Sequence, residues 1–276
     1  QTIANRFVSL SVDGKGRVAG FYNKTTQTEL IAFPESAEAW RMVVPTGRHT
    51  LALIRGSEQK PVRIDGRAVA GGQRLQLEYD GIVMGRAKLP IKALFTFYLK
   101  HDDPQVTCGI QLDNRSRYPV DEVEFPIIGG LGGFGTGKKR ELQLVQSGGY
   151  GKFHGDVLNE GLPEYGRESN HFAREHETCM VGNASDADEK CIYPGPIWLD
   201  MGAESQGLYA GYHPELLQLF AFKLEKYPKE VPNRPRHLYP KGTPRWIRLT
   251  GLHMPQIKPA QKWISEPVVL TPHAGG

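Results

Sequence analysis

Apolar and polar residues alternate at the start of the chain. Val8, Leu10 and Val12 are separated by serines, a glycine-rich turn covers residues 13–16, and a second apolar run covers residues 18–22. A period of two on either side of a glycine-rich turn predicts a β-hairpin. A polar turn follows, and we expect a third strand to begin near Glu29.

Short runs rich in β-branched and aromatic residues recur along the rest of the chain. They predict strands at residues 40–44, 50–55, 62–64, 74–79, 91–99, 106–113, 120–126, 142–146, 197–200, 207–212, 217–224, 246–253 and 263–270. Strands without intervening helices favour antiparallel pairing over βαβ units. The pattern therefore predicts an all-β protein, a large antiparallel β-sandwich.

Residues 148–195 interrupt this pattern, because glycine, asparagine and charged residues dominate there. An irregular stretch of this length inside a compact domain is usually functional or partly disordered. No internal repeat, low-complexity tract or linker divides the sequence, and single β-sandwiches reach this length. We therefore expect one domain over residues 1–276, with a long irregular loop region at 148–195.

Composition limits the class of protein. Hydrophobic residues make up 39% and charged residues 23% of the chain, which suits a packed core and excludes a disordered or collagen-like chain. No apolar run approaches the roughly 18 residues that a membrane helix needs, so we expect no membrane partner.

The net charge of +4 comes from residues 223–248, where eight Lys or Arg stand against two Glu. This stretch also contains prolines and aromatic residues, which superficially suits a nucleic-acid surface. A solvated connection between two strands explains it better, because no nucleic-acid-binding motif accompanies it. We expect no nucleic-acid partner.

The first residue is Gln1, and no signal-peptide pattern precedes the first strand, as expected when a signal peptide or a tag has been removed. We therefore expect an exported protein, secreted or periplasmic. Cys179 and Cys191 bracket a polar loop and could pair there, with two free thiols as the alternative. Cys108 lies in a strand-like run and is expected to be buried. Glycosylation sequons begin at Asn23, Asn114 and Asn183.

The opening hairpin with residues 23–31 (NKTTQTELI) looks like the first strands of carbohydrate-active β-sandwiches of the galactose-mutarotase-like type. Residues 123–130 (VEFPIIGG), together with 193–195 (YPG) and 207–214 (GLYAGYHP), are similar to the N-terminal supersandwich region of a group of glycoside hydrolases. Residues 252–257 and 266–270 resemble the last strands of that region.

The resemblance implies a galactose-mutarotase-like supersandwich that handles carbohydrate. In the hydrolases, the last strand leads into a barrel that bears the catalytic carboxylates. The resemblance therefore implies a C-terminal catalytic barrel in a longer polypeptide, and it is also compatible with a free-standing relative that binds or isomerises sugars.

The densest cluster of ionisable residues lies in the irregular stretch, at His171, Glu175, His176 and Glu177. Neighbouring imidazoles and carboxylates could act as the acid and base of an aldose mutarotase near neutral pH. Three residues separate His171 from Glu175, whereas the zinc motif His-x-x-Glu-His has two.

Two further patterns are weaker. Asn183, Asp186, Asp188 and Glu189 offer oxygen ligands for calcium, but they lack the order and glycine of an EF-hand. The glycine-rich residues 129–139 lack the spacing of a phosphate-binding loop, so a flexible turn explains them better. We expect no metal and no cofactor.

Sugar rings present apolar C–H faces edged by hydroxyls, so their binding clefts combine aromatic with polar side chains. Residues that could supply such a cleft are Trp198, Tyr209, Tyr212 and His213 from neighbouring strands and Glu164 from the irregular stretch. The competing interpretation places Trp198 and Tyr209 in the core, because they alternate with apolar neighbours. Tyr212 and His213, ahead of Pro214, are expected to be more exposed.

Three functional hypotheses follow. The first is a domain of an exported glycoside hydrolase, with residues 148–195 bordering the sugar cleft and the catalytic carboxylates elsewhere. The second is an aldose mutarotase or epimerase that uses the His/Glu cluster. The third is a carbohydrate-binding module without catalysis.

Overall fold

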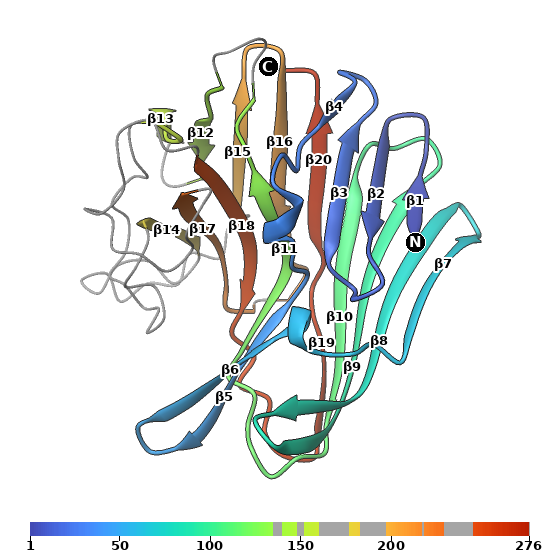
Figure 1. Cartoon of the computed structure of the whole chain (residues 1–276), viewed down its shortest axis with the longest axis vertical. Helices are drawn as coiled ribbons and strands as arrows, with labels where there is room; N and C mark the ends of the chain where they lie inside the picture. The colour runs from blue at the N-terminus through green and yellow to red at the C-terminus, as the bar shows by residue number, and fades with distance from the viewer. Residues whose placement is uncertain are drawn as a thin grey trace.

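A computed structural model describes residues 1–134, 140–147, 152–159, 177–182, 197–216, 218–228 and 245–275. Three antiparallel sheets and two short 3-10 helices make up its regular structure (Figure 1). The prediction of an all-β antiparallel sandwich is confirmed.

The largest sheet has ten strands. In order across the sheet they are β13 (Lys152–Asp156), β12 (Gln143–Gln146), β15 (Ile197–Ala203), β16 (Gln206–Tyr212), β20 (Val268–His273), β10 (Val106–Asn114), β9 (Ala87–Lys100), β8 (Gly72–Met84) and β7 (Arg63–Val69), with β19 (Gln261–Ile264) also paired to β10. Neighbours such as β16 and β20 are far apart in sequence, so the sheet is not a simple meander.

Two smaller sheets complete the fold. The six-stranded sheet contains, in order, β14 (Glu177–Gly182), β17 (Phe220–Pro228), β18 (Arg245–His253), β11 (Glu122–Leu131), β5 (Arg41–Gly47) and β6 (Thr50–Arg55). The four-stranded sheet contains β1 (Thr2–Ala4), β2 (Val8–Val12), β3 (Val18–Asn23) and β4 (Thr28–Glu29). The helices are η1 (Pro34–Ser36) and η2 (Gly56–Glu58).

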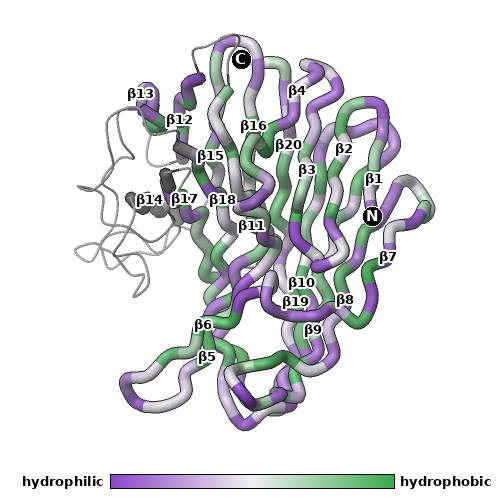
Figure 2. Tube along the Cα trace, viewed as in Figure 1, coloured by the Kyte–Doolittle hydropathy of each residue, from purple (hydrophilic) through white to green (hydrophobic). Residues whose placement is uncertain are grey.

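The two smaller sheets pack on one face of the ten-stranded sheet and enclose the core between them. Alternate residues of β9, such as Phe95 and Phe97, are fully buried, whereas their neighbours Thr96 and Tyr98 are partly exposed on the other face. Figure 2 shows the same alternation of hydrophobic and hydrophilic positions along the strands of this sheet. The buried side chains form one continuous cluster from Ile3 to Leu270.

Aromatic side chains dominate the middle of this cluster. The ring of Trp40 stacks on Phe95, with centroids 5.0 Å apart, and meets Tyr79 edge to face at 4.9 Å. Phe125 of β11 contacts both Phe95 and Phe97 from the opposite layer. These rings join the six-stranded sheet to the ten-stranded sheet through large apolar contacts.

Several strands appear where the sequence predicts them, including the opening hairpin and Thr50–Arg55. The single strand expected over residues 263–270 is wrong: β19 and β20 are separate strands. The short strands β1, β13 and β14 were not predicted. Since β13 and β14 lie within residues 148–195, the expectation of an irregular loop over that whole region is wrong. One domain over residues 1–276 stays a prediction.

The structure tests the expectations for one of the three cysteines. Cys108 is buried as expected, and burial raises the pKa of its thiol well above the usual value. The side chain of Cys179 and all of Cys191 lie outside the described residues. None of the helices in the described part of the chain has the length and apolar character of a membrane span.

In two of the three glycosylation sequons, the fold buries the asparagine side chain. The amide of Asn23 is buried and donates to the carbonyl of His273 at 3.0 Å, and the amide of Asn114 is buried and donates to the carbonyl of Tyr118 at 2.8 Å. A glycan needs an accessible amide, so neither asparagine is an acceptor in the folded protein. Asn183 lies outside the described residues.

Candidate functional site

The six-stranded sheet carries ionised side chains on the face that points away from the core. On β17, Phe222 and Leu224 belong to the hydrophobic cluster, so Lys223 and Glu225 between and beside them point to the other face. The set comprises three carboxylates and three cations, of which Glu38 lies between η1 and β5 and the others lie on the sheet: Glu38, Arg41, Glu124, Lys223, Glu225 and Arg248. All six are buried, and the most accessible, Arg248, is 7% exposed. We call this set the charged network.

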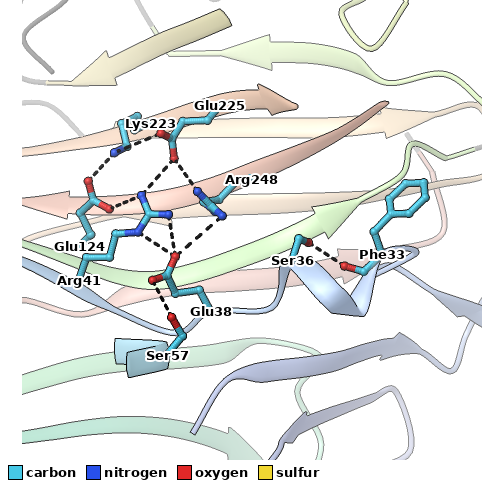
Figure 3. A network of polar contacts seen from close by, with 9 residues as sticks. All are labelled: Phe33, Ser36, Glu38, Arg41, Ser57, Glu124, Lys223, Glu225 and Arg248. Carbon is cyan, nitrogen blue, oxygen red and sulfur yellow. Dashed lines mark hydrogen bonds and ion pairs between the residues drawn. The ribbon is translucent and has the colours of Figure 1, made fainter. Parts of the chain in front are cut away.

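Arg41 lies at the centre of the charged network (Figure 3). Its Nε donates to Oε2 of Glu38 at 2.8 Å, and its Nη2 lies 2.6 Å from the same oxygen. Its Nη1 lies 3.4 Å from Oε2 of Glu124 and 3.7 Å from Oε2 of Glu225. One guanidinium therefore contacts all three carboxylates.

The other two cations close the network. The Nζ of Lys223 donates to Oε1 of Glu124 and lies 3.7 Å from Oε1 of Glu225. Arg248 pairs with Glu225 through Nη1 at 3.5 Å and with Glu38 through Nη2 at 3.8 Å. Opposite charges alternate, and the six formal charges sum to zero.

Strand register places these partners. Arg41 of β5 lies directly opposite Glu124 of β11, and Glu225 of β17 lies directly opposite Arg248 of β18. Cross-strand neighbours on one face of a sheet are close enough for side-chain contact. Burial alone would lower the pKa of the Arg41 guanidinium, but Glu124, Glu38 and Glu225 raise it well above the usual value.

The only histidine of this sheet among the described residues does not supply a free acid or base. His253 is buried, and its Nε2 lies 3.1 Å from the carbonyl oxygen of Phe125. Burial lowers the pKa of His253 to about 3, although the bond to Phe125 opposes this shift. Its imidazole is therefore neutral near neutral pH.

The predicted acid–base cluster cannot be placed. His171, Glu175, His176 and the predicted sugar ligand Glu164 lie outside the described residues. Glu177 begins β14, and its backbone pairs with Lys226 of β17, but its side chain is likewise outside the described part. The possible calcium ligands at 183–189 are also outside it, and the described residues contain no group of three or more potential metal ligands.

Three of the predicted sugar-binding residues lie together, on the outer face of the ten-stranded sheet. Trp198 and Tyr209 are partly exposed and His213 is exposed, so the interpretation of Trp198 and Tyr209 as core residues is wrong. The expectation that Tyr212 is exposed is also wrong. Its side chain is fully buried and stacks on Phe220 with centroids 4.0 Å apart.

Next to these residues lies a histidine–carboxylate pair that sequence reasoning missed. Nε2 of His273 on β20 lies 2.9 Å from Oδ1 of Asp200 on β15, and both side chains are partly exposed. The two residues are far apart in the sequence, and nothing local to either one marks the pair. The hydrogen bond to Asp200 raises the pKa of His273, while burial opposes the shift.

This raised pKa predicts a pH-dependent contribution to stability. A protonated His273 is favoured in the folded state, so the pair stabilises the fold fully below the ordinary imidazole pKa and loses this effect as pH rises through the folded pKa. We expect Asp200→Asn to lower the free energy of unfolding by roughly 0.5–1 kcal/mol at pH 6 and by less at pH 8.5, measured by urea unfolding.

The matched control is Asp113→Asn, because Asp113 pairs with Arg115 at 2.8 Å and neither group titrates in this pH range. Its effect should be the same at both pH values. An effect of Asp200→Asn that does not change between pH 6 and pH 8.5 would contradict the assignment.

Comparison with known proteins shows the fold. The chain matches no family model and no curated protein by sequence. It superposes on an alpha-N-acetylgalactosaminidase from Bifidobacterium bifidum in complex with GalNAc, with a TM-score of 0.60, 9% identity and coverage of 99% of this chain and 36% of that chain.

Smaller proteins match over their whole length. A candidate aldose 1-epimerase from Escherichia coli K12 has a TM-score of 0.53, 13% identity and coverage of 99% of this chain and 98% of that chain. A galactose mutarotase-like protein from Lactobacillus casei has a TM-score of 0.51, 10% identity and coverage of 99% of both chains. The chain therefore has the galactose-mutarotase-like β-sandwich fold that the sequence resemblance predicted.

Proposed function

We propose that the chain is a carbohydrate-handling domain of an exported glycoside hydrolase, secreted or periplasmic, whose catalytic carboxylates lie outside this chain. The observation that carries the proposal is that each carboxylate of the charged network is buried and lies within ion-pair distance of at least two cations. Its carboxylates are numerous enough for glycoside chemistry, but they are not available for it.

Glycoside hydrolysis needs two carboxyl groups on either side of the sugar bond, about 5 to 10 Å apart, and one of them must exchange a proton. Glu38, Glu124 and Glu225 are each buried and each contact at least two cations. A carboxylate that is buried and already held in two ion pairs is not free to contact a sugar. We assign the charged network to holding β5, β11, β17 and β18 in register.

The structural relatives support the link to carbohydrate. The alpha-N-acetylgalactosaminidase was solved with GalNAc bound, and this chain spans 36% of its length. In the proposal, a further catalytic domain, a barrel in the resembling hydrolases, accompanies this sandwich in a longer polypeptide. Residues 148–195, which include β13 and β14, would then border the sugar cleft.

The test compares two purified proteins on a panel of aryl α- and β-glycosides that includes GalNAc derivatives. One protein is the present chain and the other is the full open reading frame that contains it. We expect release of the aryl group by the longer protein alone. Turnover by the present chain at a similar rate would overturn the proposal, as would inactivity of both proteins on the whole panel.

Aldose mutarotation is the second candidate, because the galactose mutarotase-like protein and the candidate epimerase have this sandwich over nearly their whole length. In that case His171 or His176 would act as acid and Glu175 or Glu177 as base. Polarimetry of freshly dissolved α-glucose and α-galactose separates the two proposals. Equilibration no faster than in buffer removes this candidate, and a fast rate lost in His171→Ala or His176→Ala would favour it.

A further inference from the structure

We propose that the outer face of β15 and β16 is a binding platform for a neutral glycan, built from Trp198, Tyr209 and His213. We call these three residues the aromatic platform. It lies on the ten-stranded sheet, whereas the charged network lies on the six-stranded sheet. The inference goes beyond the proposed function, since it holds whether or not the chain belongs to a hydrolase.

The rings of Tyr209 and His213 form one extended surface. The hydroxyl of Tyr209 lies 2.9 Å from Nε2 of His213, the planes of the two rings are 9° apart, and their centroids are 6.3 Å apart. A hydrogen bond that joins the edges of two nearly parallel rings sets them beside each other rather than face on face. Burial, with a smaller contribution from Asp200, raises the pKa of Tyr209, so its hydroxyl stays protonated.

A glycine makes room for this arrangement. A Cβ atom on Gly211 would lie 2.7 Å from Nε2 of His213 and 2.7 Å from the hydroxyl of Tyr209. The two side chains therefore fold over the backbone of Gly211 and meet above it. Any larger residue at this position would occupy the place of their hydrogen bond.

Trp198 extends the surface to the neighbouring strand. It lies opposite Gly211 in the register of β15 and β16, and its ring is 23° from that of Tyr209, with centroids 6.3 Å apart. Three rings with similar orientation thus surround one glycine on two adjacent strands. Aromatic side chains therefore gather at one place on the outer face instead of lying singly on it.

Polar groups border the platform on one side. Asp200 lies opposite Tyr209 in the strand register, and its carboxylate is hydrogen-bonded to His273, which folds over Gly207 in the same way. Aromatic faces next to a carboxylate and imidazoles match the C–H faces and hydroxyl edges of pyranose rings. Because the hydrogen bonds fix the rings in advance, little side-chain entropy is lost on binding.

Within the described residues, no cluster of cations that would select an acidic polymer borders the platform. The charged pair beside it there is Asp200 with His273. We therefore assign the platform to neutral polysaccharides or long oligosaccharides, with successive sugar rings on Tyr209–His213 and on Trp198.

The test is native affinity electrophoresis of the full chain in gels that contain soluble starch, xylan, galactan or galactomannan. We expect retardation in at least one gel. Trp198→Ala and Tyr209→Ala should each weaken the apparent affinity by about tenfold, the effect of removing one stacking anchor. Gly211→Ala should also weaken it, since the added methyl group separates Tyr209 from His213.

Tyr98→Ala is the matched control. Tyr98 is a partly exposed aromatic residue on the same outer face, on β9, which is separated from β16 by β20 and β10. It should bind as the unchanged protein does. Because His213 is exposed, His213→Ala keeps the test valid if the other variants fold poorly.

Three results would overturn the inference. The first is no retardation of the unchanged protein in any of the four gels. The second is retardation that Trp198→Ala, Tyr209→Ala and His213→Ala leave intact. The third is a dimer, seen by sedimentation velocity, that dissociates into monomers in the Trp198→Ala variant. That result would assign the platform to contact between copies of the chain. Failure of the hydrolase assays would leave the gel result unaffected.

Discussion

Replacement of Arg41 by methionine is expected to lower the free energy of unfolding by about 3–5 kcal/mol. Methionine keeps much of the length and apolar volume of the arginine stem, so the change removes the charge with little loss of packing. It leaves Glu38, Glu124 and Glu225 buried with two cations in place of three. A buried charge without compensation accounts for most of the expected loss.

The matched control is Arg63→Met. Arg63 also lies on a strand between two carboxylates, Asp65 at 3.8 Å and Glu78 at 3.4 Å, but its side chain is 55% exposed. We expect this variant to lose less than about 1 kcal/mol, because water screens an exposed ion pair. Urea unfolding at neutral pH measures both values.

A second condition separates charge from packing. The deficit of Arg41→Met should shrink as the pH falls through the acid range. Three carboxylates and two cations leave a net charge of −1 in the variant, so uptake of a single proton by the network removes the uncompensated charge. A deficit equal to that of Arg63→Met would show that the network contributes little to stability. A deficit that does not change with pH would show that Arg41 acts through packing.

Local sequence patterns predict where the strands of this fold lie, but they do not predict which strands pair with each other. Alternation around a glycine turn predicted the hairpin of β2 and β3, because every determinant of a hairpin lies within it. The pairing of β16 with β20 joins Gly207 to His273, and no local signal specifies such a distant neighbour. The expected strand at 263–270 failed because a long strand-like run contains Glu266 and Pro267 between β19 and β20.

The same limit applies to the charged network. The alternation of Lys223 and Glu225 with aromatic and aliphatic residues indicates a polar face on β17, which would ordinarily be interpreted as a face toward solvent. Its burial depends on Arg41 and Glu124, which come from strands distant in the sequence. Since the compensating charges are not local, the sequence alone could not show that these residues form one network.

The position of Tyr212, in contrast, was readable from the sequence. Successive residues of a strand point to opposite faces, so Tyr209 and Tyr212, three residues apart, cannot line one cleft. The apolar neighbours Leu208, Ala210 and Tyr212 occupy the core, which leaves Tyr209 on the outer face. Strict use of the two-residue period of a strand would have predicted Tyr209 on the outer face and Tyr212 in the core.

The glycine-rich segment that begins at Gly129 yields the second large prediction. Its first part does not form a flexible turn, since Gly129 and Gly130 belong to β11 and are buried. The carbonyl of Gly130 accepts hydrogen bonds from the backbone amides of Ala32 at 2.8 Å and Phe33 at 3.1 Å. The glycine thereby holds the segment before η1 against the sheet.

Gly130→Ala is expected to lower the free energy of unfolding by about 2–5 kcal/mol. The φ angle of Gly130 is +80°, which costs a residue with a Cβ atom roughly 1–2 kcal/mol. That Cβ would also lie 2.3 Å from the carbonyl oxygen of Phe33, so the backbone must move, at a cost of about 1–3 kcal/mol. Urea unfolding measures the sum.

Gly85→Ala separates the two contributions. Gly85 also has a positive φ angle, +60°, but nothing lies within 4 Å of a Cβ built there. Its loss should therefore be about 1–2 kcal/mol, the cost of the left-handed backbone alone. Because both substitutions add the same methyl group at a positive φ angle, the excess for Gly130→Ala measures the close approach of residues 32–36 to β11. Equal losses would mean that this approach contributes nothing, and that the glycines here serve only the path of the chain.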